Sequence, residues 1–147
     1  MAYVGDFEFD TRVIAALAAE PDVTTLLGSS PMRVYTRVRR DTTLPFVRMT
    51  TIEAATLGGA MAGSSGTDWI RRHNRQFAAF SQQASCEEVS DVLKALIKVL
   101  DKGPDNIFFG SPASWRVLLA IPRYQICRYN AADATWMGVT EYEFSVS

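Results

Sequence analysis

The chain has 147 residues, of which 48% are hydrophobic and 21% are charged, and its formal net charge is −1. This is the size and composition of one ordinary globular domain, so we expect a single domain over residues 1–147 and exclude a disordered or fibrous protein. No apolar run approaches the ~20 residues of a membrane helix, and a near-neutral chain has no general attraction to nucleic acid or to membranes.

In chain order, the spacing of apolar and polar residues predicts a helix from Asp10 or Thr11 to about Ala19, a helical turn over 22–27, strands over 33–39, 46–56 and 69–81, a helix from Ser85 to about Leu100, and strands over 115–128 and 139–147. This order predicts an α+β fold, in which an antiparallel β-sheet of about four to five strands has helices packed on one face. Residues 57–68 hold four of the nine glycines, so we also expect a long flexible hairpin loop there.

The long helix is the clearest of these elements. Ser85 can cap its first turn, and Glu88, three residues later, can complete a capping box. Apolar residues then recur at helical spacing from Val89 to Leu100, before Gly103-Pro104 ends the helix. Because only one side of this helix is apolar, we expect it to cover one face of the sheet.

The sequence offers few residues for catalysis or metal binding. It has two cysteines, Cys86 and Cys127, and one histidine, His73. These residues cannot assemble a Cys/His zinc site and are a poor basis for acid–base or nucleophilic chemistry. We therefore expect no enzyme activity, no cofactor and no metal, and we place His73 on the surface of a strand. The acidic start, MAYVGDFEFD, is unlike a secretory signal, so we expect a cytosol-like compartment, where disulfides are disfavoured.

Charge is unevenly distributed along the chain. Twelve of the 15 basic residues are arginines, and eight of these fall between residues 33 and 75, whereas acids collect near the two ends. Arginine is favoured over lysine where a cation is partly desolvated in an interface. In a chain with a basic middle and acidic ends, the basic region of one copy can contact the acidic ends of another copy. The alternative is that the arginines are solvated strand faces with scattered ion pairs.

The glycine-rich segment does not have the features of a phosphate-binding loop. It matches neither GxGxxG nor GxxxxGK[ST], and a strand rather than a helix follows it. We interpret it as a connector, or as an arm that orders on contact with a partner. Trp69, Trp115 and Trp136 each lie near a strand end, where a tryptophan serves either as an interface anchor or as part of the core.

Several short segments follow one another in a characteristic order after the amphipathic first helix: VTTLLG (23–28), RVY (33–35), LPFV (44–47), FAAFS (77–81), CEEVSDVLKALIKVL (86–100) and the closing YQICRYNAADATWMGVTEYEFSV. In this order the chain resembles the tail-completion, or tail terminator, proteins of long-tailed bacteriophages and of phage-derived gene transfer agents. The resemblance spans nearly the whole chain and consists of pattern and order rather than of a catalytic signature.

The resemblance implies a structural virion protein that is not an enzyme. Members of the family form a hexameric ring at the head-proximal end of the tail tube, where the ring stops tube polymerisation and offers a surface to the head connector. The implied partners are other copies of the chain, the tail tube protein and the head connector or adaptor protein. DNA passes through such a ring without sequence-specific binding, no membrane is involved, and assembly takes place in the cytoplasm of the host bacterium.

We expect the interface with the tube or the neighbouring subunit to combine the central arginines, the glycine-rich arm and the acids of the last strand. The candidate residues are Arg37, Arg39, Arg40, Leu57, Gly58, Gly59, Met61, Gly63, Gly66, Trp69, Arg71, Arg72, Arg75, Glu141 and Glu143. Two alternatives stay open: a head-side adaptor or stopper protein, and a small ligand-binding dimeric α+β module in which His73 faces a pocket with convergent polar groups.

Overall fold

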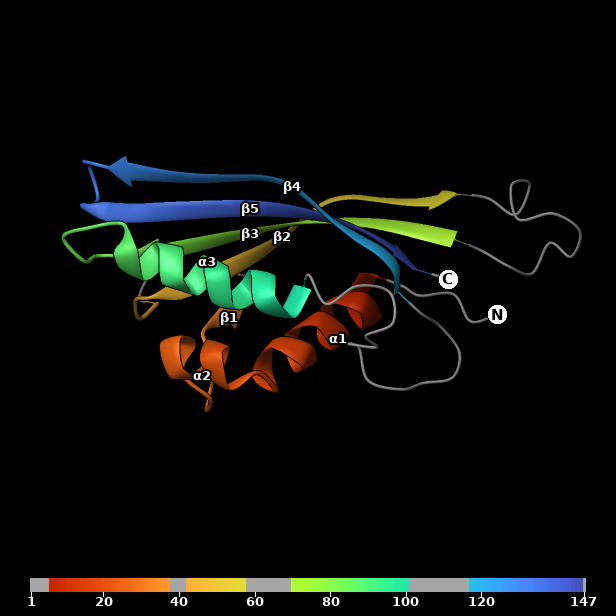
Figure 1. Ribbon diagram of the computed structural model, residues 1–147, viewed down its shortest axis with the longest axis horizontal. Helices are drawn as coiled ribbons and strands as arrows, with labels where there is room; N and C mark the ends of the chain where they lie inside the picture. The colour runs from red at the N-terminus through yellow and green to blue at the C-terminus, as the bar shows by residue number, and fades with distance from the viewer. Residues whose placement is uncertain (1–5, 38–41, 58–69, 101–116, 147) are drawn as a thin grey trace, which may run out of the picture.

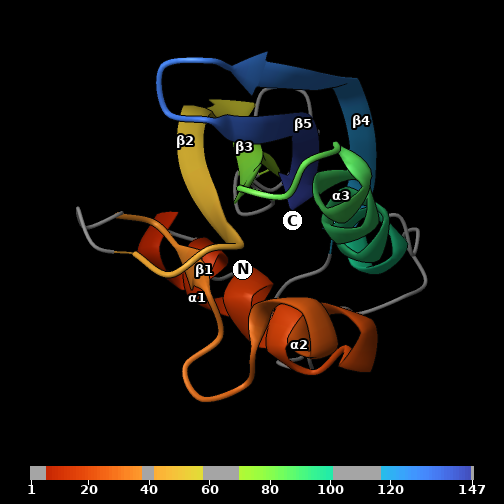
Figure 2. The same cartoon turned by 90° about the vertical axis from the view of Figure 1, so that its left-hand side faces the viewer.

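The computed structural model describes residues 6–37, 42–57, 70–100 and 117–146. Its elements in chain order are α1 (Asp6–Ala18), α2 (Pro21–Leu27), β1 (Val34–Tyr35), β2 (Phe46–Leu57), β3 (Ile70–Ser81), α3 (Glu87–Leu100), β4 (Val117–Asn130) and β5 (Thr135–Val146). The strands form one sheet in the order β1-β2-β3-β5-β4, and the three helices pack against one side of it (Figure 1, Figure 2). The predicted α+β class is confirmed. The glycine-rich segment from residue 58 to residue 69 lies outside the described residues.

The long strands pair antiparallel, as predicted, but the short first strand differs. β1 has two residues and runs parallel to β2, with Val34 opposite Val47, where the alternation over 33–39 predicts a longer strand. A period of two shows which side chains share a face but not the direction of the partner strand. At the far edge of the sheet, β4 and β5 stay paired up to Asn130 and Thr135. The turn between them is therefore shorter than the gap between the predicted strands over 115–128 and 139–147.

α1 begins at Asp6, about one turn earlier than predicted. Phe9, Val13 and Leu17 recur every four residues and are fully buried, so the apolar stripe of the helix begins at Phe9. α2 has Pro21 in its first turn and ends at Gly28, where the backbone φ of +81° favours glycine.

Polar contacts at both ends of α3 attach it to neighbouring elements. At its start, the Glu88 carboxylate accepts hydrogen bonds from the Ser81 hydroxyl (2.5 Å) and the Gln83 amide (2.7 Å). Glu88 therefore ties the helix to the end of β3, while the Ser85 hydroxyl accepts the N–H of Glu87 at 3.4 Å.

The last turn of α3 is joined to α2 by an exposed lysine. Lys98 Nζ donates to Asp22 Oδ2 at 2.6 Å and lies 3.6 Å from Glu20 Oε1. The hydrogen bond to Asp22, followed by the charges of both acids, raises the pKa of Lys98. These ion pairs connect α2 and α3 at the surface, while buried apolar side chains of both helices belong to the core.

The core lies between the helices and the sheet. Its largest apolar side chains come from the three helices and the three central strands: Phe9, Leu17, Leu27, Met49, Phe77, Leu93, Leu96, Leu100, Tyr142 and Phe144. α3 lies close to the sheet at Gly138 of β5, where an added Cβ would lie 2.2 Å from Cγ1 of Val89 and 2.8 Å from Cδ1 of Leu93. The glycine therefore allows α3 to pack directly on the backbone of β5.

The prediction that His73 lies on the surface of a strand is wrong. His73 is fully buried and stacks on Phe9 of α1, with ring centroids 4.2 Å apart and an interplanar angle of 2°. Arg75 is buried beside it: its Nε donates to Asp10 Oδ1 at 2.7 Å, and its guanidinium lies over the Phe9 ring. α1 thus supplies an aromatic ring and a carboxylate that compensate the burial of two polar side chains. These partners are more than 60 residues away in the sequence, since Asp10 and Arg75 are 65 residues apart.

Candidate functional site

The face of the sheet opposite the helices is not covered by any element within the described part of the chain (Figure 2). We call it the open face. β3 presents its even-numbered residues from Arg72 to Phe80 to it, and they alternate with residues that are buried under the helices. Arg72, Gln76 and Phe80 are the partly exposed ones. On β5, Glu141 lies opposite Gln76 and Met137 lies opposite Phe80. The open face therefore changes character along the strands, from polar at one end to apolar at the other.

The polar half brings together three of the predicted interface residues. Arg72 Nη1 lies 4.0 Å from Glu143 Oε1, and the two side chains are 31% and 16% exposed. Glu141 lies two positions before Glu143 and on the same face, as the alternation predicts. An arginine–glutamate contact that is expected between subunits thus exists within one subunit. A long, partly exposed pair of this kind stabilises a protein by at most about 1 kcal/mol.

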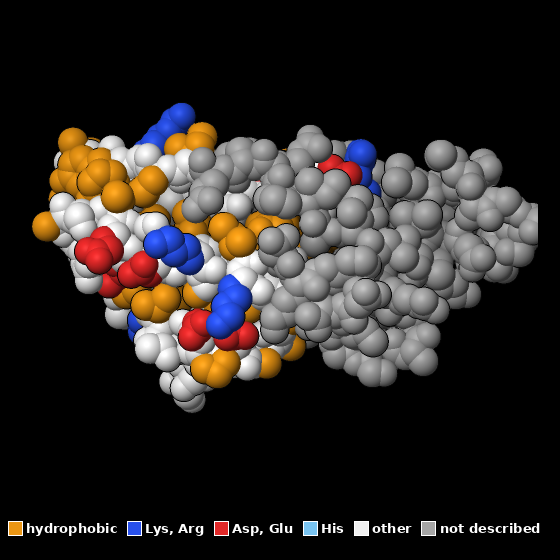
Figure 3. Space-filling view, in the orientation of Figure 1, with side chains coloured by type: hydrophobic (Ala, Val, Ile, Leu, Met, Phe, Trp, Pro, Cys, Tyr) orange, Lys and Arg blue, Asp and Glu red, His pale blue; other side chains and the backbone are white. Residues whose placement is uncertain are grey.

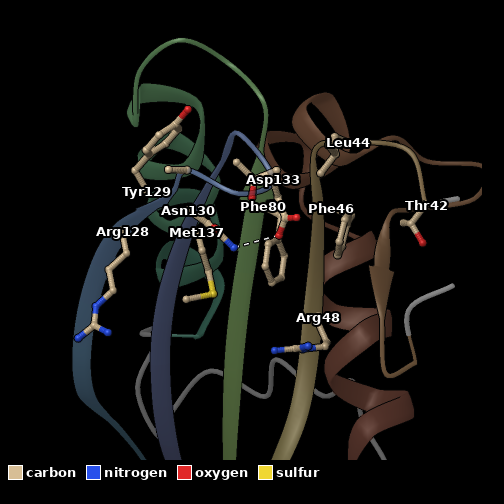
Figure 4. A pocket seen from close by; sticks show the side chains of 12 residues that line it. Thr42, Leu44, Phe46, Arg48, Phe80, Arg128, Tyr129, Asn130, Asp133 and Met137 are labelled. Carbon is tan, nitrogen blue, oxygen red and sulfur yellow. Dashed lines mark hydrogen bonds between the residues drawn. The ribbon is translucent and has the colours of Figure 1, made fainter. Parts of the chain in front are cut away.

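The apolar half, next to the β4–β5 hairpin, is hollowed into a groove of about 600 Å³ (Figure 4). Phe46 of β2 and Phe80 of β3 stack in it with ring centroids 4.9 Å apart, and Met137 of β5 lines it beside them. Arg48 and Arg128, on opposite sides of this apolar floor, also line it. The two rings are half-buried, and stacked rings that are partly open to solvent on an uncovered face are typical of a docking surface.

A second hollow of about 400 Å³ continues the first one along the strands. It shares Arg48, Arg128 and Met137 with the first hollow and adds Ile126 and Val139. We call the two hollows together the sheet groove. Their shared residues make them one continuous concave surface that spans four strands.

The sheet groove is apolar along its floor and cationic at its sides. Arg48 lies over the Phe80 ring, 5.6 Å from its centroid, and both Arg48 and Arg128 are exposed. Neither arginine makes an ion pair with any residue that the structure describes. Asp133, an acid of the lining, accepts a hydrogen bond from Asn130 Nδ2 at 2.9 Å. The groove therefore offers aromatic surface and two solvent-facing guanidinium groups to a partner.

These side chains suit docking rather than chemistry. Among the residues that the structure describes, no three His, Cys, Asp or Glu side chains gather closely enough to hold a metal ion. No helix in the same residues is long and apolar enough to span a bilayer. Cys127 pairs with Gly138 on the helix side of the sheet, and partial burial and then the neighbouring Cys86 raise the pKa of Cys127. A thiol with a raised pKa is a weak nucleophile at neutral pH.

The predicted interface residues lie in different surroundings. Arg72, Glu141 and Glu143 share the open face, and Arg37 is exposed just after β1. Arg75 is buried against Asp10, so it is left out of the docking surface proposed below. Leu57 and Arg71 belong to the paired ends of β2 and β3. The remaining predicted positions fall outside the described residues: Arg39, Arg40, Gly58, Gly59, Met61, Gly63, Gly66 and Trp69.

The groove residues Phe46, Arg48, Phe80, Arg128 and Met137 are absent from the predicted set. They come from four strands, and the sheet register brings them together, with Phe46 opposite Phe80 and Arg128 opposite Met137. The alternation of β2 puts Phe46 and Arg48 on one face. The sequence does not show, however, which of the two faces the helices leave uncovered.

Comparison with known proteins gives a family match and a similar solved structure. Residues 11–136 match the family model described as tail completion protein gp17. Among solved structures, the chain is similar to a protein chain in the "virion of native gene transfer agent (GTA) particle", with a TM-score of 0.70 and 12% identity over 99% of this chain and 98% of that one. At that identity the similarity shows the shared fold alone. No curated protein sequence matches the chain.

The family model covers most of the chain, including every described element except the first turn of α1 and most of β5. This match agrees with the resemblance inferred from the order of the sequence segments. The chain therefore belongs to the tail completion protein gp17 family and is a structural protein of a phage-type tail or head.

Proposed function

We propose that the protein forms a ring of six copies that caps the head-proximal end of the tail tube, stops its polymerisation and joins the tail to the head. Family membership supports a role in completing the tail. The uncovered aromatic and cationic groove on the open face is the observation that carries the docking role, because an isolated subunit has no need of it.

A closed ring needs two different surfaces of each subunit to meet. The open face is one such surface. A sheet edge is another, because β4 runs for 14 residues with no strand on its outer side in the described part of the chain. Long strand edges are commonly covered by a neighbouring chain. We also assign contact with the tube or the neighbour to five arginines of the central part of the sequence: Arg37, Arg39, Arg40, Arg71 and Arg72.

The glycine-rich segment is the proposed arm of the subunit. β2 and β3 stay paired as far as Leu57 and Ile70, so the segment leaves from the end of a two-strand ladder. We assign contact with the tail tube or the adjacent subunit to Leu57, Gly58, Gly59, Met61, Gly63, Gly66 and Trp69. Hydrogen exchange on free and assembled protein tests this role. Protection is expected only after assembly, and equal fast exchange in both states would remove the arm from the interface.

The proposed partners are other copies of the chain, the tail tube protein and the head connector or adaptor protein. DNA passes through the ring without sequence-specific binding, and the ring carries out no chemistry and needs no cofactor. Assembly occurs in the cytoplasm of the host bacterium. The alternative of a dimeric ligand-binding module loses its support, because His73 packs against Phe9 in the core and lines neither hollow of the sheet groove.

Electron microscopy of tails assembled with and without the protein tests the proposal. Tails of uniform length with six-fold density at one end are expected only when the protein is present. Reversing two charges in Arg71→Glu/Arg72→Glu should abolish tail joining while the subunit stays folded. Lys94→Glu, at a side chain that is 73% exposed on the helix side, serves as the matched control. Tubes that stop at the same length without the protein would overturn the proposal. Binding to the portal side without any effect on tube growth would assign the protein to the head-side adaptors.

A further inference from the structure

Phe7, in the first turn of α1, is the most exposed large apolar side chain among the described residues, at 86%. Its neighbours in the sequence DFEFD are acidic, since Asp6 and Glu8 flank it directly. Phe9, two residues later, is fully buried, so the helix is attached to the core beside Phe7. An exposed aromatic ring on a helix that is fixed to the core, with acids on both sides in the sequence, has the features of an interface anchor.

The sheet groove has the complementary features. Its floor is formed by the stacked rings of Phe46 and Phe80, and its sides carry Arg48 and Arg128, which face solvent. An aromatic side chain can pack on such rings, and carboxylates beside it can pair with the guanidinium groups. The helix side of the molecule offers no such match, because acidic and basic side chains are interspersed over α2 and α3 (Figure 3).

Phe7 and the sheet groove of the same chain cannot meet. Phe9 stacks on His73, whereas the Phe80 ring of the groove lies seven residues further along β3. At about 3.3 Å per strand residue this is a separation of about 23 Å along the strand. The two sites also lie on opposite faces of the sheet, because α1 packs on the helix side (Figure 1). A contact between them must therefore join two different molecules.

We propose that the sheet groove of one subunit binds the acidic and aromatic segment around Phe7 of the next subunit. Phe7 packs on Phe46 and Phe80, and the acids beside it pair with Arg48 and Arg128. Because the two surfaces differ, each subunit uses one toward each neighbour, which is the heterologous contact that a ring requires. This inference rests on the proposed ring and names the surfaces that close it.

A peptide-binding experiment tests the contact independently of ring formation. The probe is a fluorescent peptide of residues 2–12, AYVGDFEFDTR, and the receptor is the full chain with Phe7→Ser, which leaves its own groove free. We expect saturable binding that weakens with added salt. It should fall at least tenfold when the receptor also carries Arg48→Gln/Arg128→Gln or when the peptide carries Phe7→Ser. Lys94→Glu in the receptor should leave it unchanged.

Sedimentation and electron microscopy of the full chain provide the second readout. Phe7→Ser and Arg48→Glu/Arg128→Glu should each prevent ring assembly, and joining the latter with Asp6→Lys/Glu8→Lys should restore it. Rings that form equally well in every variant would overturn this inference and leave the proposed function standing. Failure of the unmodified chain to form rings or to act on tubes would instead overturn the proposed function. A peptide that does not bind would overturn the groove assignment in either case.

Discussion

Replacing Gly138 with alanine adds one methyl group at the place where α3 packs on β5. The new Cβ would lie 2.2 Å from Cγ1 of Val89 and 2.8 Å from Cδ1 of Leu93, whereas carbon atoms in contact are normally about 3.5–4.0 Å apart. Leu93 can turn its terminal methyl away. Val89 is β-branched and held to one rotamer in a helix, so part of the strain must be taken up by movement of α3.

The expected cost follows from two opposing effects. Overpacking a well-packed core destabilises a protein by about 1–3 kcal/mol. Replacing glycine with alanine also restricts the unfolded chain, which stabilises the fold by about 0.4–1 kcal/mol. We therefore expect Gly138→Ala to lower the free energy of unfolding by about 1–2 kcal/mol, and Tm by about 2–8 °C for a chain of this size. Urea unfolding followed by circular dichroism measures this change.

Val89→Ala is the matched control, because it removes the side chain closest to the added methyl group. Alone it leaves a small cavity and destabilises the protein, but combined with Gly138→Ala the two changes should partly cancel, with a coupling energy of about 0.5–3 kcal/mol. Gly138→Ala with unchanged stability, or a double variant whose effects simply add, would refute the close packing of α3 on β5.

Two further predictions concern buried and partly buried polar groups. Asp10→Asn removes the carboxylate that pairs with the buried Arg75 and should lower the free energy of unfolding, measured in urea, by about 2–4 kcal/mol. Asp91→Asn, in the exposed pair with Lys94, is the control and should change it by less than about 0.5 kcal/mol. Equal effects of the two substitutions would contradict the buried pair. Because partial burial and the neighbouring Cys86 raise the pKa of Cys127, less thiolate is present at a given pH, and alkylation of Cys127 should be slow until the pH rises well above the ordinary thiol value. Cys86→Ser should shift the pH midpoint of this alkylation, measured by mass spectrometry, to lower pH, and an unchanged midpoint would show that the two thiols do not interact.

Local pattern in the sequence was sufficient to predict α3, the long strands and the α+β class. In α3 the apolar spacing and the Ser85 cap agree with each other, so the helix starts and ends close to the predicted residues. The burial of His73 and Arg75 depends on Phe9 and Asp10, which approach them only after α1 has packed on the sheet. Contacts between residues so far apart in the sequence cannot be predicted from local periodicity.

The sheet groove was beyond prediction for a related reason. Its residues follow the period of two that is expected of strands, but their grouping depends on strand order and register. Their exposure depends on which face of the sheet the helices cover. The open position of Glu141 and Glu143 could be predicted, because the period of two in the last strand is regular. The partner of Arg72 could not, because the order β3-β5-β4 has to be known first.

The end of β3 connects the two sides of the molecule. Phe80 faces the sheet groove, whereas Ser81, the next residue, faces the helices, and its hydroxyl donates a hydrogen bond to Glu88 at the start of α3. A single peptide unit thus separates a docking surface from the first turn of a core helix. In an isotopically labelled subunit, the amide signals of that first turn should report whether the groove is occupied, without any probe attached to the surface that binds.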